Sequence, residues 1–204
     1  MSVSESTARR YALSDPDVRL MLEVRDDNAA AFEELMLRYQ NRLITVLTHL
    51  VGHREWAEDL AQDVFLRVYR SRKRYLPGAK FSTWLFTIAN NLAANALRDR
   101  SRRPEVNVAE RTSAETSGVF GLDQMAVAAS GLMPARQLDK MEMREVVRLA
   151  IQGLNDRQRM AVLLCKFESM SFEEIGAAME MTPKAVKSLL ARARANLPIP
   201  AALP

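Results

Sequence analysis

Hydrophobic residues along this chain recur every three or four positions over long stretches, a period that predicts helices rather than strands. Capping side chains, prolines and glycines stand where these helices are expected to begin and end. In the first half of the chain the pattern predicts four helices: one opened by Ser14-Asp15-Pro16, one from about Asn28 to Gly52, one from about Arg54 to Ser71, and one from Ser82 or Thr83 to the arginine-rich end near residue 103. We expect these helices to form one compact unit over residues 15–103, preceded by a loose polar tail over residues 1–14.

The periodic pattern fails over residues 104–138, where Ser, Thr, Ala, Gly and acidic residues are common, so we expect a flexible linker there. The periodic pattern returns over residues 139–197, where it predicts four more helices. We expect a short tail over residues 198–204. The predicted fold class is therefore all-α, with two small helical domains joined by a flexible linker.

The second domain has the pattern of a helix-turn-helix. Ser171 and Glu174 stand at the S-x-x-E spacing of a capping box, and Asn155 with Gln158 resembles another. Thr182-Pro183 is a typical start for the last helix. Two short helices separated by a tight turn, the second of them basic, are typical of a unit that places its second helix in the major groove of DNA.

Composition excludes several other classes of protein. A single cysteine, Cys165, excludes an internal disulfide framework and suits a reducing compartment. The longest apolar runs are shorter than the ~18 residues that a membrane-spanning helix needs, and the first residues lack the apolar core of a signal peptide. We therefore expect a cytoplasmic protein with no direct membrane insertion.

Catalytic chemistry finds little support in the sequence. His49 and His53 have no cysteine or carboxylate at metal-ligand spacing. Cys165 lies in an apolar run, which is typical of a buried and inert thiol. There is no glycine-rich phosphate loop and no serine nucleophile elbow. We expect no enzymatic activity, no metal and no cofactor.

The distribution of charge is more informative than the net charge of +4. Residues 67–103 contain ten Lys or Arg side chains and one acid, around the aromatic cluster Lys80-Phe81-Ser82-Thr83-Trp84-Leu85-Phe86. Positive charge attracts a polyanion, and exposed rings can stack on unpaired bases. Trp84 and Phe86 cannot point the same way on a helix, so at least one should pack inside. We expect Phe81, Ser82 and Thr83 to be exposed, and core packing remains the alternative for the rings.

An acidic helix face precedes this basic segment. Asp59, Gln62 and Asp63 lie on one side of the predicted helix within about one turn. The face could be merely solvated, and Asp63 could pair with Arg67 four positions later. Because carboxylates repel nucleic acid, a protein partner with a basic surface is the better explanation if this face binds anything.

The last helix is basic, with Lys184, Lys187, Arg192 and Arg194 and no acid. In a helix-turn-helix, Lys187 and Ser188 would lie nearest base edges and phosphates, and the two arginines would hold the DNA backbone. A solvated face of a terminal helix is the alternative.

Several motifs together resemble a known family. Residues 56–65 (Trp-Ala-Glu-Asp-Leu-Ala-Gln-Asp-Val-Phe), 77–85 (Pro-Gly-Ala-Lys-Phe-Ser-Thr-Trp-Leu) and 88–91 (Ile-Ala-Asn-Asn) resemble the second conserved domain of bacterial sigma factors, in the form of the extracytoplasmic-function (ECF) group of the sigma-70 family. Residues 154–159, 171–176, 186–188 and 192–194 resemble the fourth domain. The motifs follow in the family's order, with a linker in place of the third domain.

The resemblance implies a transcription initiation subunit that binds core RNA polymerase, directs it to promoter DNA and helps open it. It assigns polymerase binding to Asp59, Gln62 and Asp63. It assigns binding of the −10 strand to Lys80, Phe81, Ser82, Thr83, Trp84 and Asn91. We add Arg98 from the basic segment to this set. It assigns the −35 element to the last helix, with Thr182, Lys184, Lys187, Ser188, Arg192 and Arg194 as candidates. Many relatives are held inactive by an anti-sigma factor, so such a partner is also expected.

The chain departs from the family pattern at three positions. Leu189 stands where an arginine is usual, and Asn95 replaces a more usual aspartate. Glu180 occupies a turn position usually held by glycine, where a left-handed backbone costs a residue with a side chain about 1 kcal/mol. The alternative to a sigma factor is a stand-alone helix-turn-helix regulator, which would leave the acidic face and the aromatic cluster unused.

Overall fold

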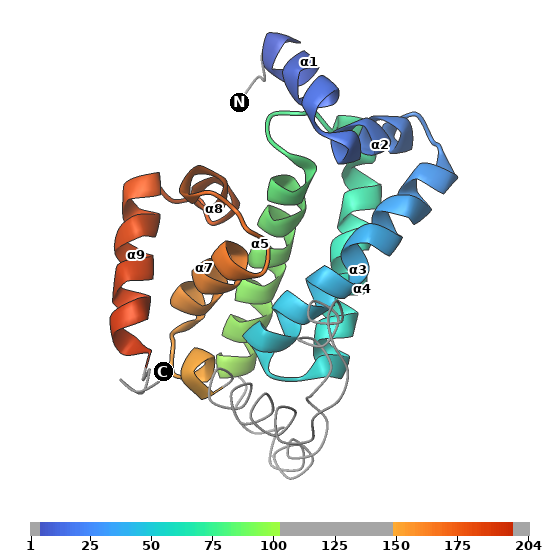
Figure 1. Ribbon diagram of the computed structural model, residues 1–204. Helices are drawn as coiled ribbons and strands as arrows, with labels where there is room; N and C mark the ends of the chain where they lie inside the picture. The colour runs from blue at the N-terminus through green and yellow to red at the C-terminus, as the bar shows by residue number, and fades with distance from the viewer. Residues whose placement is uncertain (1–4, 103–148, 198–204) are drawn as a thin grey trace, which may run out of the picture.

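The computed structural model describes residues 5–102 and 149–197, and this part of the chain is helical and contains no strand. The first domain comprises α1 (Glu5–Ser14), α2 (Pro16–Arg25), α3 (Ala29–Val51), α4 (Arg54–Ser71), the 3-10 turn η1 (Arg72–Arg74) and α5 (Phe81–Arg102). The second comprises α7 (Asp156–Lys166), α8 (Phe172–Ala178) and α9 (Pro183–Asn196). The predicted all-α class is confirmed (Figure 1). The predicted linker over residues 104–138 and tail over residues 198–204 lie outside the described residues.

The helix boundaries follow the capping residues. The side chain of Asp15 caps α2 and that of Asn28 caps α3. Gly52 ends α3 in the left-handed region, with φ of 83°, where glycine has no steric penalty. α5 begins at Phe81, slightly earlier than predicted.

The prediction of a loose tail is wrong for residues 5–14, which form α1. Tyr11 and Ala12 pack against the hydrophobic core, and the Ser14 hydroxyl donates to the carbonyl of Arg10 at 2.9 Å. The sequence of α1 is polar on average, and no residue in it is fully buried. Its contact with α2 depends on tertiary structure that a local pattern does not contain.

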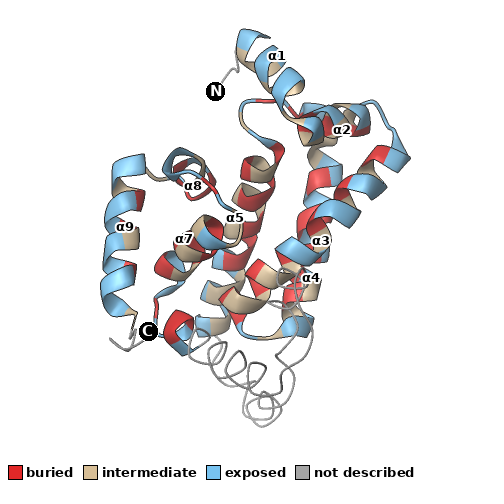
Figure 2. Ribbon diagram, viewed as in Figure 1, coloured by how far each residue is buried: buried red, intermediate tan, exposed pale blue. Residues whose placement is uncertain are grey.

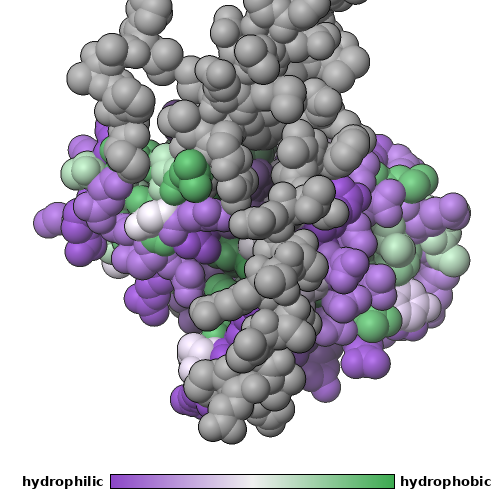
Figure 3. Space-filling model, turned by 90° about the horizontal axis from the view of Figure 1, so that it is seen from below, coloured by the Kyte–Doolittle hydropathy of each residue, from purple (hydrophilic) through white to green (hydrophobic). Residues whose placement is uncertain are grey.

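The core of the first domain is centred on α3. Leu35, Leu43 and Leu47 are fully buried and meet apolar faces of α2, α4 and α5. In Figure 2 the buried residues of these helices face one another, while the exposed residues form the outer surface. The face of the molecule seen in Figure 3 is mainly hydrophilic wherever described residues are visible, with small, separate hydrophobic spots.

The second domain forms the predicted helix-turn-helix. Asn155 with Gln158 and Ser171 with Glu174 make complete capping boxes, and Thr182 caps α9. α7, α8 and α9 pack on one another, and α7 and α8 also contact α3 and α5 of the first domain. The two domains therefore lie side by side (Figure 1).

The turn between α8 and α9 depends on close backbone packing. A Cβ added at Gly176 would lie 2.6 Å from the carbonyl oxygen of Met181, so only glycine fits there. Glu180 has φ of 55°, so the left-handed conformation expected at this position is present despite its side chain.

Candidate nucleic-acid interface

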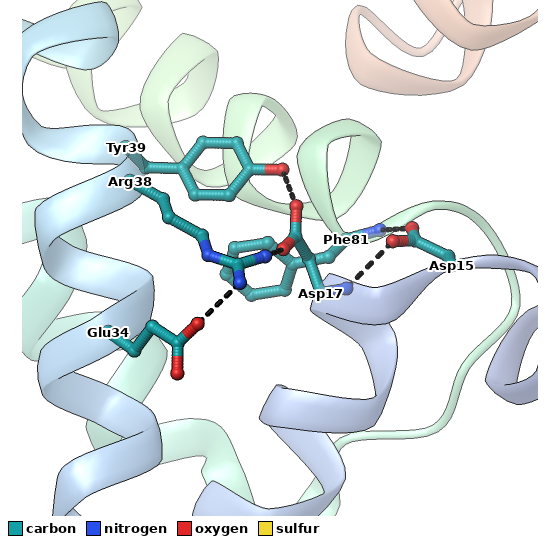
Figure 4. A network of polar contacts seen from close by, with 6 residues as sticks. All are labelled: Asp15, Asp17, Glu34, Arg38, Tyr39 and Phe81. Carbon is teal, nitrogen blue, oxygen red and sulfur yellow. Dashed lines mark hydrogen bonds and ion pairs between the residues drawn. The ribbon is translucent and has the colours of Figure 1, made fainter.

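A hydrogen-bond network fixes the start of α5, where the aromatic cluster lies. One carboxylate oxygen of Asp15 accepts from the backbone N–H of Asp17 at 2.9 Å, and the other accepts from the N–H of Phe81 at 3.0 Å. Asp17 in turn accepts from the Tyr39 hydroxyl and from Arg38, which also pairs with Glu34 (Figure 4). Burial and the neighbouring Asp17 raise the pKa of Tyr39, which keeps its hydroxyl protonated as a donor.

The aromatic cluster is more deeply buried than the sequence suggested. Phe81 is fully buried and packs on Tyr39, with ring centroids 5.1 Å apart, and Thr83 is also buried. The expectation that these two side chains are exposed is therefore wrong. They point inward because α5 begins at Phe81 itself, which gives that residue a place in the hydrophobic face of the helix. Ser82 and Trp84 are half-buried and keep part of their surface accessible.

An open pocket of about 740 Å³ lies between α4 and α5 beside the partly exposed Trp84. Its walls are formed by basic, aromatic, amide and aliphatic side chains: Arg67, Arg70, Ser71, Arg74, Trp84, Ile88 and Asn91. Tyr75 lies behind Trp84, with ring centroids 4.7 Å apart, and steadies the indole from the core side. The pocket joins positive charge, a flat ring and an amide, which are the groups that hold a phosphate, stack on a base and hydrogen-bond to its edge.

The basic segment divides into paired and unpaired charges. Arg72 and Lys73 both pair with Asp27 and lower the pKa of that carboxyl group, and the Arg100 guanidinium lies 5.0 Å from the centre of the Trp56 ring. Within the described residues, by contrast, the three pocket arginines form no ion pair: Arg67, Arg70 and Arg74. Their charge is available to an anion. Arg98 is exposed farther along α5, where it donates to Asn95 at 3.4 Å.

The acidic residues Asp59, Gln62 and Asp63 are exposed on α4, as their spacing predicted. The pairing of Asp63 with Arg67 considered from the sequence does not form in the described part of the chain. Leu66, one turn farther along the same face, is also 49% exposed. The face therefore presents two carboxylates, an amide and an apolar side chain without covering groups from the described residues.

The second helix of the helix-turn-helix exposes its basic side. Lys184, Lys187 and Ser188 are exposed on the first turns of α9, and Arg192 and Arg194 are exposed near its end. The Thr182 hydroxyl oxygen accepts from the N–H of Ala185 at 3.2 Å. Leu189 is buried, so in this chain its position belongs to the core of the domain and offers no side chain to DNA.

The described residues contain no group of three or more His, Cys, Asp and Glu side chains arranged to hold a metal ion. None of their helices has the length and apolar character needed to cross a membrane.

The family models agree with this division into domains. Residues 35–103 match the model for sigma-70 region 2, and residues 144–197 match the model for sigma-70, region 4. The ECF RNA polymerase sigma-E factor of Escherichia coli is 30% identical over 178 residues, which are 87% of this chain and 90% of that protein. This chain belongs to the ECF group of the sigma-70 family. It is therefore an RNA polymerase sigma factor, and the alternative of a stand-alone regulator is set aside.

Other relatives of this sigma factor have similar lengths. The RNA polymerase sigma-H factor of Pseudomonas aeruginosa is 31% identical over 88% of this chain and 91% of its own. The sigma factor CarQ of Myxococcus xanthus is 36% identical over 82% of this chain and 87% of its own. A solved structure of CnrH in complex with the cytosolic domain of CnrY has the same fold, with a TM-score of 0.62 at 23% identity, over 90% of this chain and 95% of that one.

The resemblance assigned Trp84 and Asn91 to the same strand, and in the structure both line one pocket, but the sequence analysis did not name three other residues of that pocket. Arg67, Arg70 and Arg74 stood in the basic segment without being singled out. Their spacing of three and four residues was the available signal, because it places side chains on one face of a helix. Nothing local marked Arg42 and Glu168, which pair across the two domains.

Proposed function

We propose that this sigma factor binds core RNA polymerase, directs it to specific promoters, and helps open the DNA by holding one strand in the pocket between α4 and α5. The observation that carries the proposal is the composition of that pocket, where Trp84 and Asn91 are joined by three arginines that pair with no acid among the described residues. A duplex base pair offers no free face for stacking, so this combination suits an unpaired nucleotide.

The strand would be held by different groups at its backbone and at its bases. Arg67, Arg70 and Arg74 supply charge-assisted hydrogen bonds to phosphates. Trp84 offers part of its ring, and Asn91 an amide that can recognise a base edge. Stacking contributes roughly 1–3 kcal/mol per base, comparable to the few kcal/mol needed to unstack and unpair one, so melting can proceed without an external energy source. The chain supplies recognition and no bond-making chemistry.

The residues expected at the −10 strand divide into direct contacts and residues of the core. Ser82, Trp84 and Asn91 remain direct contacts, and Lys80 and Arg98 remain candidates for the phosphate backbone. Phe81 and Thr83 act from the core, where they fix the start of α5.

Polymerase binding is assigned to α4. Asp59, Gln62 and Asp63 form an exposed face that is suited to a basic protein surface and unsuited to nucleic acid. Because this face and the pocket share α4, docking on the polymerase would fix the position of the pocket relative to the DNA.

Recognition of the upstream promoter duplex is assigned to α9. Lys184, Lys187 and Ser188 lie on its first turns, where a recognition helix meets base edges. Arg192 and Arg194 are assigned to phosphates, which position the helix without specifying sequence. Thr182 is assigned chiefly to capping α9.

The partners follow from this assignment. They are core RNA polymerase, promoter DNA and an anti-sigma factor, and the site of action is the cytoplasm. CnrH was solved with the cytosolic domain of CnrY, and the sigma factor RpoE of Bartonella quintana with the anti-sigma factor NepR. These complexes support a search for an inhibitor of this chain.

The test is run-off transcription with purified core polymerase and a fragment library of the host genome. With the sigma factor added, we expect discrete transcripts from a few fragments and a stable complex with core polymerase. Transcripts that do not depend on the added chain, together with no complex on gel filtration, would overturn the proposal.

A further inference from the structure

The pocket between α4 and α5 carries positive charge that the described part of the chain does not neutralise. Arg67, Arg70 and Arg74 are exposed, and none of the residues that line the pocket is acidic. In the same segment, by contrast, Arg72 pairs with Asp27 at 3.1 Å. Like charges three and four residues apart repel one another, so an anion bound among the three pocket arginines would stabilise this end of α4.

The aromatic wall of the pocket is held in place by the core. The indole of Trp84 has the ring of Tyr75 at 4.7 Å and that of Phe81 at 6.0 Å, measured between ring centroids. Both supporting rings are buried, whereas Trp84 keeps part of its surface accessible. A ring that is already fixed loses little conformational entropy when a ligand stacks on it. The chain by itself therefore presents a preformed stacking surface.

The pocket has the size of a site for one small molecule. Its volume of about 740 Å³ lies within the range of roughly 300–1,000 Å³ that is usual for ligand pockets. A nucleic-acid strand has one phosphate between successive bases, whereas a nucleoside polyphosphate carries several phosphates beside one base. Three guanidinium groups beside the one aromatic residue of the pocket lining suit a nucleoside polyphosphate as well as a strand.

Asn91 favours one class of base. Residues 84, 88 and 91 of α5 all line the pocket, and their spacing of four and three residues places them on one face of the helix. An asparagine amide can bond to N6 and N7 of adenine at once, because one of these atoms donates and the other accepts. Guanine presents two acceptors on the same edge. We therefore expect adenine to be preferred.

We propose that this sigma factor binds a nucleoside polyphosphate, with adenine preferred, in the pocket between α4 and α5. The polyphosphate lies on Arg67, Arg70 and Arg74, while the base stacks on Trp84 and meets Asn91. Binding makes and breaks no covalent bond. Because the opened promoter strand would use the same groups, the nucleotide competes with it and weakens promoter opening. This competition rests on the proposed function, whereas the nucleotide site itself does not.

The test titrates nucleotide into the full-length chain without polymerase or DNA. The chain has two tryptophans, so Trp56→Phe leaves Trp84 as the fluorescent reporter, and Trp56 does not line the pocket. The probes are ATP, GTP, inorganic tripolyphosphate, which has the charge without a ring, and adenosine, which has the ring without the charge. Equilibrium dialysis of radiolabelled ATP against the unaltered chain repeats the measurement without the substitution.

We expect ATP to quench the remaining indole saturably, and tripolyphosphate to compete with it only at roughly tenfold higher concentration, since stacking adds to the charge contacts. Adenosine should show no saturable binding in the same range. Replacing Arg67, Arg70 and Arg74 with alanine should abolish ATP binding with unchanged helical circular dichroism. Arg25→Ala, outside the pocket lining, should leave ATP binding unchanged. GTP should bind several-fold more weakly than ATP, and Asn91→Ala should remove this preference.

Absence of saturable ATP binding, or equal binding to the parent and the triple alanine variant, would overturn the nucleotide site. Equal affinities for ATP and tripolyphosphate would also overturn it, because they would mean general attraction of anions. ATP should further displace a −10 single-stranded oligonucleotide from the holoenzyme. Strand binding that needs the three arginines but is insensitive to ATP would overturn the nucleotide proposal and leave the proposed function standing. Saturable ATP binding without promoter-dependent transcripts would do the reverse.

Discussion

The carboxylate of Asp15 accepts a hydrogen bond from the backbone N–H of Phe81 at 3.0 Å, although 66 residues separate them. Asp15 also caps α2, so one side chain joins the start of α2 to the start of α5, the helix that carries Trp84 and Asn91. The position of the pocket between α4 and α5 thus depends on a residue that touches no part of it.

Asp15→Ala removes the acceptor at both helix starts. Loss of one cap costs about 0.5–2 kcal/mol, so we expect the free energy of unfolding to fall by at least about 1 kcal/mol in urea denaturation. Asp15→Asn keeps an acceptor oxygen, so its free energy of unfolding should fall by less. Equal stability of the alanine variant and the parent would contradict the double role.

Replacing Arg67, Arg70 and Arg74 with alanine should weaken binding of holoenzyme to a −10 single strand. Each lost phosphate contact should reduce the magnitude of the slope of log affinity against log salt by about 0.7. The slope of the triple variant should therefore be smaller in magnitude by about 2. Arg25→Ala removes a half-buried arginine of α2 that pairs with Asp26 and does not line the pocket, and it serves as the control. An unchanged slope in fluorescence anisotropy would refute the phosphate role.

Charge reversal on α4 should weaken docking on core polymerase without destabilising the fold. Asp59→Arg with Asp63→Arg should reduce affinity for core polymerase at least tenfold while leaving the thermal unfolding temperature nearly unchanged, because both side chains are exposed. Glu33→Arg, on an exposed position of α3, is the matched control. If Glu33→Arg weakens the complex with core polymerase as much as the α4 double variant does, the α4 face is not the docking surface.

Lys187→Ala should weaken binding of an upstream promoter duplex, by about 1–3 kcal/mol if it contacts a base edge. Lys166→Ala removes an exposed lysine at the end of α7 and should have a small effect. Comparable losses for the two variants in an electrophoretic mobility assay would mean that α9 attracts DNA only through general charge.

Gly176→Ala should destabilise the second domain by about 1–3 kcal/mol, the usual cost of overpacking. The added methyl group would meet a backbone oxygen, which has little freedom to move. Gly153→Ala meets only an ordinary contact at 3.5 Å and should be tolerated. Differential scanning calorimetry of both variants checks the contrast.

Much of the fold was predictable because its signals are local. Capping residues such as Asn28 and Ser171 satisfy backbone groups within a few positions, so their sequence spacing alone locates helix starts. The helix-turn-helix and the exposed α4 face followed from the same short-range geometry. Leu189 also shows the limit of motif comparison, since its departure from the family becomes a core contact in this chain.

The remaining features depend on contacts between distant segments. Phe81 and Thr83 are buried because Tyr39, from α3, and the rest of the core cover the start of α5. The pairing of Arg42 with Glu168 joins residues 126 positions apart, and charge alone does not identify such partners. The helix α1 similarly depends on packing against α2.

The most direct test of strand opening is permanganate reactivity of thymines in a promoter recovered from the run-off screen. With core polymerase and the parent sigma factor, we expect reactive thymines confined to the −10 region. With Arg67, Arg70 and Arg74 replaced by alanine together with Trp84, the complex should still form but reactivity should fall to the level of free duplex. Full reactivity with that variant would contradict the claim that the pocket between α4 and α5 holds the opened strand.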